Sequence, residues 1–476
     1  MESPSKAVLN AVSPGTAHIL LAGAILFFLA AMTGCAHYPV NEPLTQIDPA
    51  KGYRAQYAGQ PGQSQELVLY LTFSGGGTRA AAFSYGVLEE LRDTRVTFDG
   101  KQRRLLDEVD VISSVSGGSF TSAYYGLFGE RIFEDFEAKF LKRNVQGAIV
   151  SRVLFNPVNW ARLWSPYFDR SDLAADYYHE HVFDKKTFSD MAAAKGPMIY
   201  INATEMTTGI RIAFTQDSFD VLCSDLSTFP VARAAAASSA VPILLTPITL
   251  KSYAGSCGFA LPPALEQLLS TQETSARQYH LVNDVRPFME PDRFRFVHLV
   301  DGGVADNLGL RTALDRIMFF GNAWTMMQMT GTEKTRKVVF VVVNAETEVS
   351  KEMNIFGKPP AFGAMLSSYS TVAITRYNYE TLMLLRENFR RWTEEVQKGR
   401  CGDKPISTEP GECGDIQFHL VEVKFDALKD PAERSYFKQL PTSFKLSDDE
   451  VDKLREAARR ILKASPEYQR LLKGIQ

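Results

Sequence analysis

Residues 67–79 have the sequence LVLYLTFSGGGTR, in which an apolar run leads into three consecutive glycines. The apolar part is typical of a strand buried on both faces of a parallel sheet. A helix that begins directly after glycines leaves backbone N–H groups pointing outward with no side chains over them. Such groups bind a phosphate or a developing oxyanion. We therefore predict a strand over 67–73, an anion-binding turn at 75–77 and a helix after it.

A second strand and turn have the sequence VDVISSVSGG, residues 109–118. Ser116 lies among small residues at a sharp strand-to-helix turn, the setting of a nucleophile elbow, in which the serine Oγ is pushed out over the sheet. The usual Gly-x-Ser-x-Gly pattern has glycine where this chain has Ser114. Serine is small enough for the turn, so we expect a strained elbow. The two turns supply a nucleophile and an oxyanion hole, the two parts that acyl transfer needs.

Other glycine-loop chemistries fit these turns less well. Gly75-x-Gly77-x-x-Ala80 matches the dinucleotide fingerprint, but the second strand ends in residues 113–118 without a carboxylate to hold a ribose. Thr78-Arg79 stands where a Walker loop has Gly-Lys-Ser/Thr. The remaining alternative is a pair of tight turns that use glycine for backbone freedom alone.

A third element is Asp301-Gly302-Gly303, which follows the apolar run 294–300. An aspartate at the carboxyl end of a strand lies at the edge where open α/β sheets build their sites. With this element the chain resembles the patatin-like phospholipase family over residues 66–345. The resemblance is carried by five blocks in the family's order: residues 75–79 (GGGTR), 114–118 (SVSGG), 202–209 (NATEMTTG), 236–242 (AASSAVP) and 301–303 (DGG).

The resemblance implies a three-layer α/β/α fold with a mainly parallel central sheet. It also implies a Ser–Asp dyad that needs no cofactor, with Ser116 as nucleophile and Asp301 as general base. The implied oxyanion hole consists of Gly75, Gly76, Gly77 and Gly117. Arg79 would meet the phosphate of the substrate or hold the start of the helix.

A histidine base is the rival hypothesis. The chain order Ser116, Asp301, His419 is also that of the α/β-hydrolase triad, although His419 lies in an alternating, strand-like segment at 415–423. The family resemblance favours the dyad, whose carboxylate base would keep working below pH 6, where histidine is charged. We expect packing roles for His419 and His298. We expect no metal at His179-Glu180-His181, because nothing nearby has ligand spacing.

The first residues carry an export signal. Residues 17–33 are almost unbroken apolar and end at Thr33-Gly34-Cys35, which resembles a bacterial lipobox. We expect a signal peptide at 1–34, lipidation of Cys35 and, with Ala36 after the cysteine, sorting to the outer membrane. The alternative is a plain N-terminal membrane anchor.

The remainder of the 476 residues divides into three expected parts. Residues 35–65 are polar and rich in Gly, Pro and Gln, which predicts a flexible tether. Residues 66–345 would form the catalytic core, and 346–476 an extension that packs on it, with an outer helix at 365–392 and a helical pair at 446–475. The net charge of −3 and the lack of a basic stripe give no support to a nucleic-acid partner.

Four cysteines remain if Cys35 is lipidated, and they allow three pairings. Cys401 and Cys413 flank a Gly/Pro-rich loop, so we predict that they are joined, which leaves Cys223 for Cys257. Free buried thiols are the alternative.

Residues 154–168, LFNPVNWARLWSPYF, form an aromatic-rich insertion. We favour a helical cover with its aromatic side chains in the core over a cap that touches lipid. The sequence as a whole predicts a hydrolase of lipid esters, of phospholipase A or lysophospholipase type, held at a membrane. The alternatives are a carboxylesterase on short soluble esters and a catalytically silent lipid-binding envelope protein.

Overall fold

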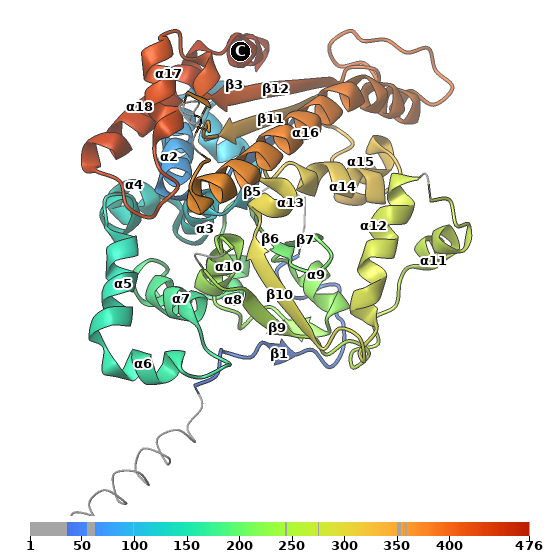
Figure 1. Cartoon of the computed structure of the whole chain (residues 1–476). Helices are drawn as coiled ribbons and strands as arrows, with labels where there is room; N and C mark the ends of the chain where they lie inside the picture. Colours follow the sequence, from blue (N-terminus) through green and yellow to red (C-terminus); the bar gives the residue numbers. More distant parts are fainter. Residues whose placement is uncertain are drawn as a thin grey trace, which may run out of the picture.

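The computed structural model describes residues 36–54, 62–98, 100–242, 245–274, 276–349, 354–355, 357 and 359–475. Within these ranges the largest sheet has eight strands in the order β12-β11-β2-β5-β6-β10-β9, with β7 paired to β6 (Figure 1). Its strands are β2 (Leu67–Phe73), β5 (Val109–Val115), β6 (Met198–Glu205), β7 (Arg211–Ala213), β9 (Ile248–Lys251), β10 (Phe296–Asp301), β11 (Lys337–Asn344) and β12 (Gln417–Lys424).

The middle of the sheet is parallel, as predicted. The pairs β12–β11, β11–β2, β2–β5 and β5–β6 are parallel, whereas β10 runs antiparallel to both β6 and β9. Strand β2 begins and ends at the predicted residues and is buried along nearly its whole length. Short strands outside this sheet are β1 (Glu42–Pro43) with β8 (Ser224–Asp225), and β3 (Arg95–Phe98) with β4 (Lys101–Arg104).

Helices cover both faces of the sheet, which confirms the three-layer α/β/α fold. Adjacent residues of a strand point to opposite faces. Ser113 of β5 bonds Thr312 in one helical layer, whereas the next residue, Ser114, accepts a hydrogen bond from Ser122 in the other. Figure 1 shows α16 crossing over β11 and β12 on one side, with α2 and α18 on the other.

The helices have the following bounds. They are α2 (Gly77–Asp93), α3 (Gly117–Phe128), α4 (Ile132–Phe136), α5 (Val145–Phe155), α6 (Pro157–Leu163), α7 (Arg170–His181), α8 (Phe188–Ala193), α9 (Gln216–Val221), α10 (Val231–Ser238), α11 (Pro263–Ser270), α12 (Arg277–Val285), α13 (Gly303–Asp306), α14 (Arg311–Phe319), α15 (Ala323–Thr330), α16 (Phe362–Cys401), α17 (Pro431–Gln439), α18 (Asp448–Ala464) and α19 (Pro466–Ile475). Along the described ranges, no helix combines the length and apolar character that a membrane span requires. Residues 17–33 and Cys35 lie outside the described residues.

The prediction of a flexible tether is wrong for residues 36–54. Asn41 is buried and bonds Ser224 Oγ and the Lys251 carbonyl, and Arg54 forms ion pairs with Asp217 and Asp220. Asn41 and Arg54 thus use polar groups of a linker-like sequence as a buried and a paired hydrogen-bonding group. The segment is therefore part of the folded body.

The C-terminal residues belong to the same core. Strand β12 extends the central sheet beside β11, and α18 packs on α2. The predicted outer helix is α16, and the predicted helical pair is α18 and α19. The extension thus completes the sheet that it was expected to pack against.

The structure contains the disulfides Cys401–Cys413 and Cys223–Cys257, the predicted pairing. We expect peptide mapping of the exported protein under non-reducing conditions to recover the Cys401–Cys413 link. Replacing both of these cysteines with serine should lower the free energy of unfolding by about 3 kcal/mol, because the closed loop is lost from the unfolded state. Thermal denaturation measures the change. Alkylation of all four thiols in native, oxidised material would contradict the pairing.

Candidate active site

Ser116 occupies a strained turn between β5 and α3. Its φ of 50° and ψ of −121° lie in a region that residues with a side chain rarely adopt. This is the geometry expected of an elbow that lifts a serine out of the sheet. Ser114 fits without distortion, because its Oγ donates to the Tyr200 carbonyl and accepts from Ser122. The departure from glycine at this position is thus accommodated.

Ser238 holds the backbone of the elbow. Its Oγ accepts a hydrogen bond from the Ser116 N–H at 2.8 Å and donates to the Asn202 carbonyl at 2.6 Å. Ser238 ends α10, so this one hydroxyl connects the elbow to β6 and α10. The strained φ of Ser116 is compensated by such fixed neighbours.

Asp301 lies beside Ser116, and the interaction of its carboxyl with the serine hydroxyl lowers the pKa of the carboxyl. The strand register explains the proximity. Val115 pairs with Asn202, and the next residue of β6, Ala203, pairs with Asp301. Because β10 is antiparallel to β6, the rule for carboxyl ends of parallel strands does not apply to it. Asp301 reaches the site because only the last three residues of β10, Leu299 to Asp301, pair with β6, and they pair with the last residues of β6.

Burial sets the electrostatics of Asp301. Loss of solvent raises the pKa of its carboxyl to about 6, against the lowering effect of hydrogen bonds from the Gly303 N–H and the Ser116 hydroxyl. The Gly303 N–H lies 2.7 Å from Oδ1 and fixes the orientation of the carboxyl. A carboxyl with a pKa of about 6 is mostly ionised at neutral pH and still accepts a proton readily. This pKa means that the carboxyl becomes increasingly protonated below pH 6, a higher pH than for an ordinary aspartate.

The two glycine turns touch backbone to backbone. A Cβ on Gly117 would lie 2.0 Å from the Gly77 carbonyl oxygen, so no other residue allows the turns this close. Gly76 and Gly77 also have φ values of +140° and +60°, which favour glycine. Close contact of the two turns places the start of α2 beside Ser116.

The turns leave backbone donors for an oxyanion. The N–H groups of Gly76, Gly77 and Gly117 have no hydrogen-bond partner among the residues that the structure describes. The Gly75 N–H is different, because it donates to the Asn307 carbonyl at 3.1 Å. The prediction that Gly75 is an oxyanion donor is therefore wrong. Its lack of a side chain instead lets the loop pass close to Asn307 and Ser116.

Arg79 holds the C-terminal segment instead of facing a substrate. Its side chain is 2% exposed, and its guanidinium donates to the carbonyls of Ala345 and Leu440 and to the hydroxyl of Thr442. The Ser443 carbonyl in turn accepts from the N–H of Thr78, in the first turn of α2. Arg79 thus anchors the helix start against residues 440–443, and the phosphate-binding alternative is corrected.

The structure keeps His419 away from Ser116. His419 is level with Val339 and Leu69, near the starts of the parallel strands, whereas Ser116 follows the end of β5. Strand β12 is also three strands from β5, about 14 Å at the usual strand spacing. His419 bonds Glu467 instead. The triad hypothesis is therefore wrong.

The other histidines have local partners. His298 shares a hydrogen bond with Thr249, and His181 bonds Arg152, which also pairs with Glu180. In the described part of the chain, no group of three or more His, Cys, Asp or Glu side chains has a metal-binding arrangement.

Sequence reasoning overlooked two residues of the site, Ser238 and Asn307. Ser238 belongs to a block that was quoted for the resemblance and Asn307 follows another by four residues, but only the fold reveals their contacts. A serine that bonds the backbone of the nucleophile has no signature beyond its small size. In chemical terms, the arrangement combines a strained serine, a buried carboxyl beside it and N–H groups without a partner among the described residues, which are the parts that an acyl-transfer site needs.

The raised pKa of Asp301 predicts a stability effect. Its folded-state pKa of about 6 lies above the ordinary value of 3.8, so the folded protein is destabilised when the carboxyl is ionised. Asp301→Asn should raise the free energy of unfolding at pH 7.5 by up to about 3 kcal/mol, at about 1.36 kcal/mol per pKa unit. The gain should shrink as the pH falls through 6 and disappear below about 4. Thermal denaturation across this pH range checks it, and a gain that does not depend on pH would contradict the assigned cause.

Solved structures similar to this chain have low sequence identity to it. Among solved structures, human GIVD cytosolic phospholipase A2 matches with a TM-score of 0.44 and 14% identity, over 86% of this chain and 62% of that chain. The same human enzyme in complex with methyl gamma-linolenyl fluorophosphonate gives a TM-score of 0.41 and 12% identity, over 86% and 59%. VipD from Legionella pneumophila gives 0.25 and 12%, over 88% and 71%. The chain thus spans about three fifths of the human enzyme chains.

A search of curated proteins finds no match. The family model described as patatin-like phospholipase matches residues 71–314, more than half of the chain. This range contains Ser116, Asp301 and both glycine turns. The chain therefore belongs to the patatin-like phospholipase family.

Proposed function

We propose that this protein is a serine acyl hydrolase that cleaves ester bonds of membrane lipids, of phospholipase A or lysophospholipase type. The observation that carries the proposal is the position of Ser116, on its strained turn, beside the buried carboxyl of Asp301. Membership of the patatin-like phospholipase family supports a lipid as the substrate.

The reaction starts with a proton transfer. Asp301 accepts the proton of Ser116 Oγ as the oxygen attacks the acyl carbonyl carbon. The tetrahedral oxyanion accepts hydrogen bonds from the N–H groups of Gly76, Gly77 and Gly117. Protonated Asp301 then gives its proton to the leaving alcohol oxygen. In the second half, Asp301 takes a proton from the water that attacks the acyl-enzyme. It then returns this proton to Ser116 Oγ as the acyl–oxygen bond breaks and the fatty acid leaves.

The pKa of about 6 suits both roles of Asp301. An ordinary aspartate, with a pKa near 3.8, would be a weak base for a serine hydroxyl. Burial makes the ionised carboxylate more basic, while the Gly303 N–H keeps it oriented. The rate is therefore expected to fall as the pH drops through about 6, because the base becomes protonated.

The alternatives keep the scaffold and change its use. A silent lipid-binding protein rested on Ser114, which the structure accommodates in the elbow without distortion. A carboxylesterase on short soluble esters would use the same dyad, so only substrate comparison separates it from a lipid hydrolase.

Ser116→Ala tests the activity. Phospholipid vesicles incubated with wild-type protein should accumulate free fatty acid and the matching deacylated lipid. The alanine variant should lose the reaction by at least 10³-fold, because the nucleophile is gone. Lipid mass spectrometry measures both products, and equal product from both proteins would refute the proposal. Turnover of short esters alone, with intact vesicle lipids, would favour the carboxylesterase.

Two further variants separate the dyad from a histidine mechanism. Asp301→Asn keeps the shape of the side chain but removes the base, which should cost about 10² to 10⁴ in rate. His419→Ala should leave the rate within a few-fold, because His419 bonds Glu467 away from the site.

We also propose that the protein is an exported bacterial lipoprotein, anchored in the outer membrane through Cys35. The support is the sequence alone: an apolar run at 17–33 followed by Thr33-Gly34-Cys35. The two disulfides agree with an oxidising compartment.

Metabolic labelling with a fatty-acid probe tests the anchor. The wild-type protein should be labelled, and Cys35→Ser should abolish the label, because the acylated thiol is gone. Membrane fractionation checks the destination separately. A label that persists in the Cys35→Ser variant would reject the lipoprotein assignment.

A further inference from the structure

An exposed apolar patch covers α6 and the ends of its neighbours. Six large apolar side chains within residues 154–167 point into solvent: Leu154, Phe155, Val158, Trp160, Trp164 and Tyr167. Phe155 is 81% exposed. The prediction that these aromatics form a core is therefore wrong. We name these six residues the α5–α6 patch.

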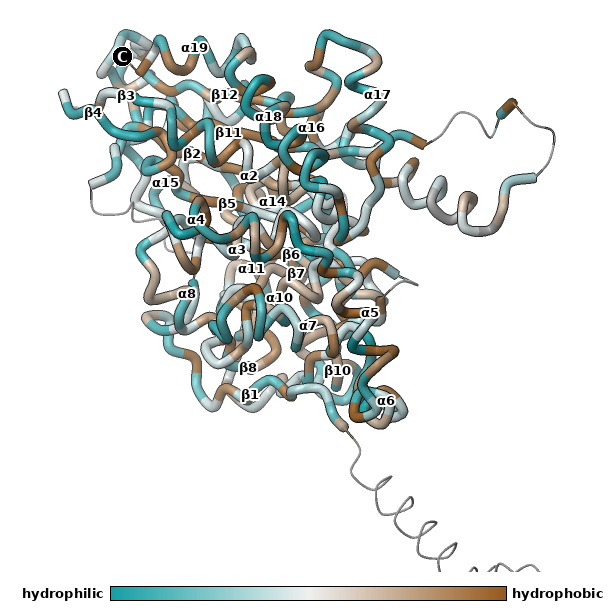
Figure 2. The backbone as a smooth tube through the Cα atoms, turned by 90° about the vertical axis from the view of Figure 1, so that its left-hand side faces the viewer, coloured by the Kyte–Doolittle hydropathy of each residue, from teal (hydrophilic) through white to brown (hydrophobic). Residues whose placement is uncertain are grey.

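The patch adjoins the point where the described chain begins. Ser165 Oγ donates to the carbonyl of Ala36, and the Tyr38 N–H donates to the carbonyl of Tyr167. The His37 ring stacks on Tyr167. Cys35 precedes Ala36 directly, so any group on Cys35 starts within one residue length, about 3.5 Å, of this contact. Figures 1 and 2 show α6 and β1 at the same end of the molecule.

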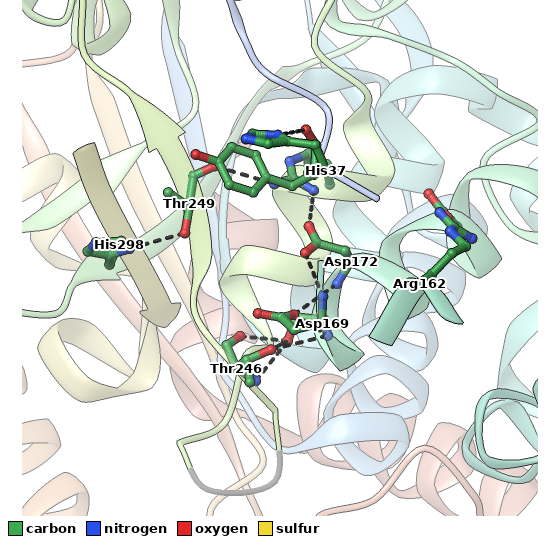
Figure 3. A network of polar contacts seen from close by, with 11 residues as sticks. His37, Arg162, Asp169, Asp172, Thr246, Thr249 and His298 are labelled. Atoms are coloured by element: carbon green, nitrogen blue, oxygen red, sulfur yellow. Dashed lines mark hydrogen bonds and ion pairs between the residues drawn. The ribbon is translucent and has the colours of Figure 1, made fainter. Parts of the chain in front are cut away.

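A buried polar network makes this end rigid. Arg233 of α10 pairs with Asp172 of α7 and lies against the ring of Tyr38. In the same network Ser171 bonds Thr246, and Thr249 bonds His298 (Figure 3). The segment beginning at Ala36 is therefore fixed to α7 and α10, and its orientation relative to the patch is set by the fold.

We propose that the α5–α6 patch docks on the surface of a phospholipid bilayer, with Trp160, Trp164 and Tyr167 at the level of the lipid headgroups. Trp and Tyr concentrate at this level because their rings are apolar with one polar group. Both interpretations of residues 1–35, a lipidated Cys35 or a membrane anchor at 17–33, bring a bilayer to Ala36 and hence to the patch. The inference gives the proposed lipid hydrolase an orientation, and it rests on that function for its biological meaning.

The charges around the patch favour apolar insertion over attraction to anionic lipids. Arg152 pairs with Glu180, and Arg162 pairs with Asp176 and lies over the ring of Phe168. These guanidinium groups are therefore neutralised by neighbours. Docking should change little between vesicles with and without an anionic lipid.

Helix α5 connects the patch with the active site. Its eleven residues span about 16 Å, and the N–H of Gln146 in its first turn donates to the Phe444 carbonyl. The preceding residue, Ser443, accepts from the Thr78 N–H beside the oxyanion turn. A bilayer in contact with the patch thus lies about one short helix from the residues that flank Gly77.

Tryptophan fluorescence offers a direct test, because Trp160 and Trp164 are themselves in the patch. The full chain is reconstituted in phosphatidylcholine vesicles whose acyl chains carry bromine, a quencher that acts at short range. We expect quenching in the wild type, and its loss in Trp160→Phe/Trp164→Phe but not in Trp324→Phe. Quenching that survives loss of both patch tryptophans would overturn the proposal, and so would its absence from the wild type.

A charge variant tests docking without removing the reporters. Phe155→Glu/Val158→Glu changes side chains that are 81% and 66% exposed, so the fold should be kept. We expect at least a tenfold loss of quenching and of vesicle hydrolysis, with turnover of a soluble ester unchanged. The matched control is Met329→Glu/Ile406→Glu, which adds the same charge at positions that are 68% and 56% exposed and outside the patch. It should change none of these readouts.

The outcomes separate this proposal from the proposed function. Ser116→Ala should abolish hydrolysis and retain quenching. Quenching without hydrolysis in the wild type would refute the enzyme and leave the docking surface intact. Hydrolysis with unchanged quenching in Phe155→Glu/Val158→Glu would refute the docking surface and leave the enzyme intact.

Discussion

The active site depends on the contact between two glycine turns, where the backbone of Gly117 lies against the carbonyl of Gly77. A side chain on Gly117 would push β2–α2 and β5–α3 apart and separate the oxyanion donors from the serine, whereas one on Gly77 would meet the backbone of Ser443. The contact also explains why the C-terminal residues 440–443 are needed. They cap the start of α2 through Arg79 and Thr78, and so hold one of the two turns in place.

Burial gives the same region its chemistry. Asp301 is enclosed enough that its pKa rises to about 6, which destabilises the folded protein at neutral pH. Ser116 adds backbone strain at φ 50°. Two hydrogen bonds oppose these destabilising effects: Ser238 Oγ accepts from the Ser116 N–H, and the Gly303 N–H donates to the Asp301 carboxyl. The site is thus less stable than an unstrained turn with a neutral side chain would be, as is common where reactive groups are held ready.

The sequence predicted the structure correctly where the local pattern of a segment matches the contacts that the segment makes in the fold. Strand β2 has its predicted bounds, because an apolar run followed by glycines has few other uses. Predictions were wrong where they rested on the amino-acid composition of a segment, because composition does not reveal which residues it contacts. Residues 36–54 were assigned to a tether because they are polar, yet Asn41 is buried and bonded. For Arg79 the sequence left two roles open, a phosphate contact and support of the helix start. Only the fold decides between them, because its partners Ala345 and Leu440 are more than 260 residues away in sequence.

The aromatic insertion shows the opposite error, because apolar composition was taken to mean burial. Apolar side chains lower the free energy wherever they leave water, and a bilayer serves as well as a protein core. Phe155 and Trp164 are exposed, and Trp164 precedes Ser165, which bonds Ala36, where the proposed membrane attachment would begin. A rigid join at Tyr38 and Arg233 then converts a point of attachment into a fixed orientation. An attachment at one point leaves a protein free to rotate, and a second, apolar contact beside it removes that freedom.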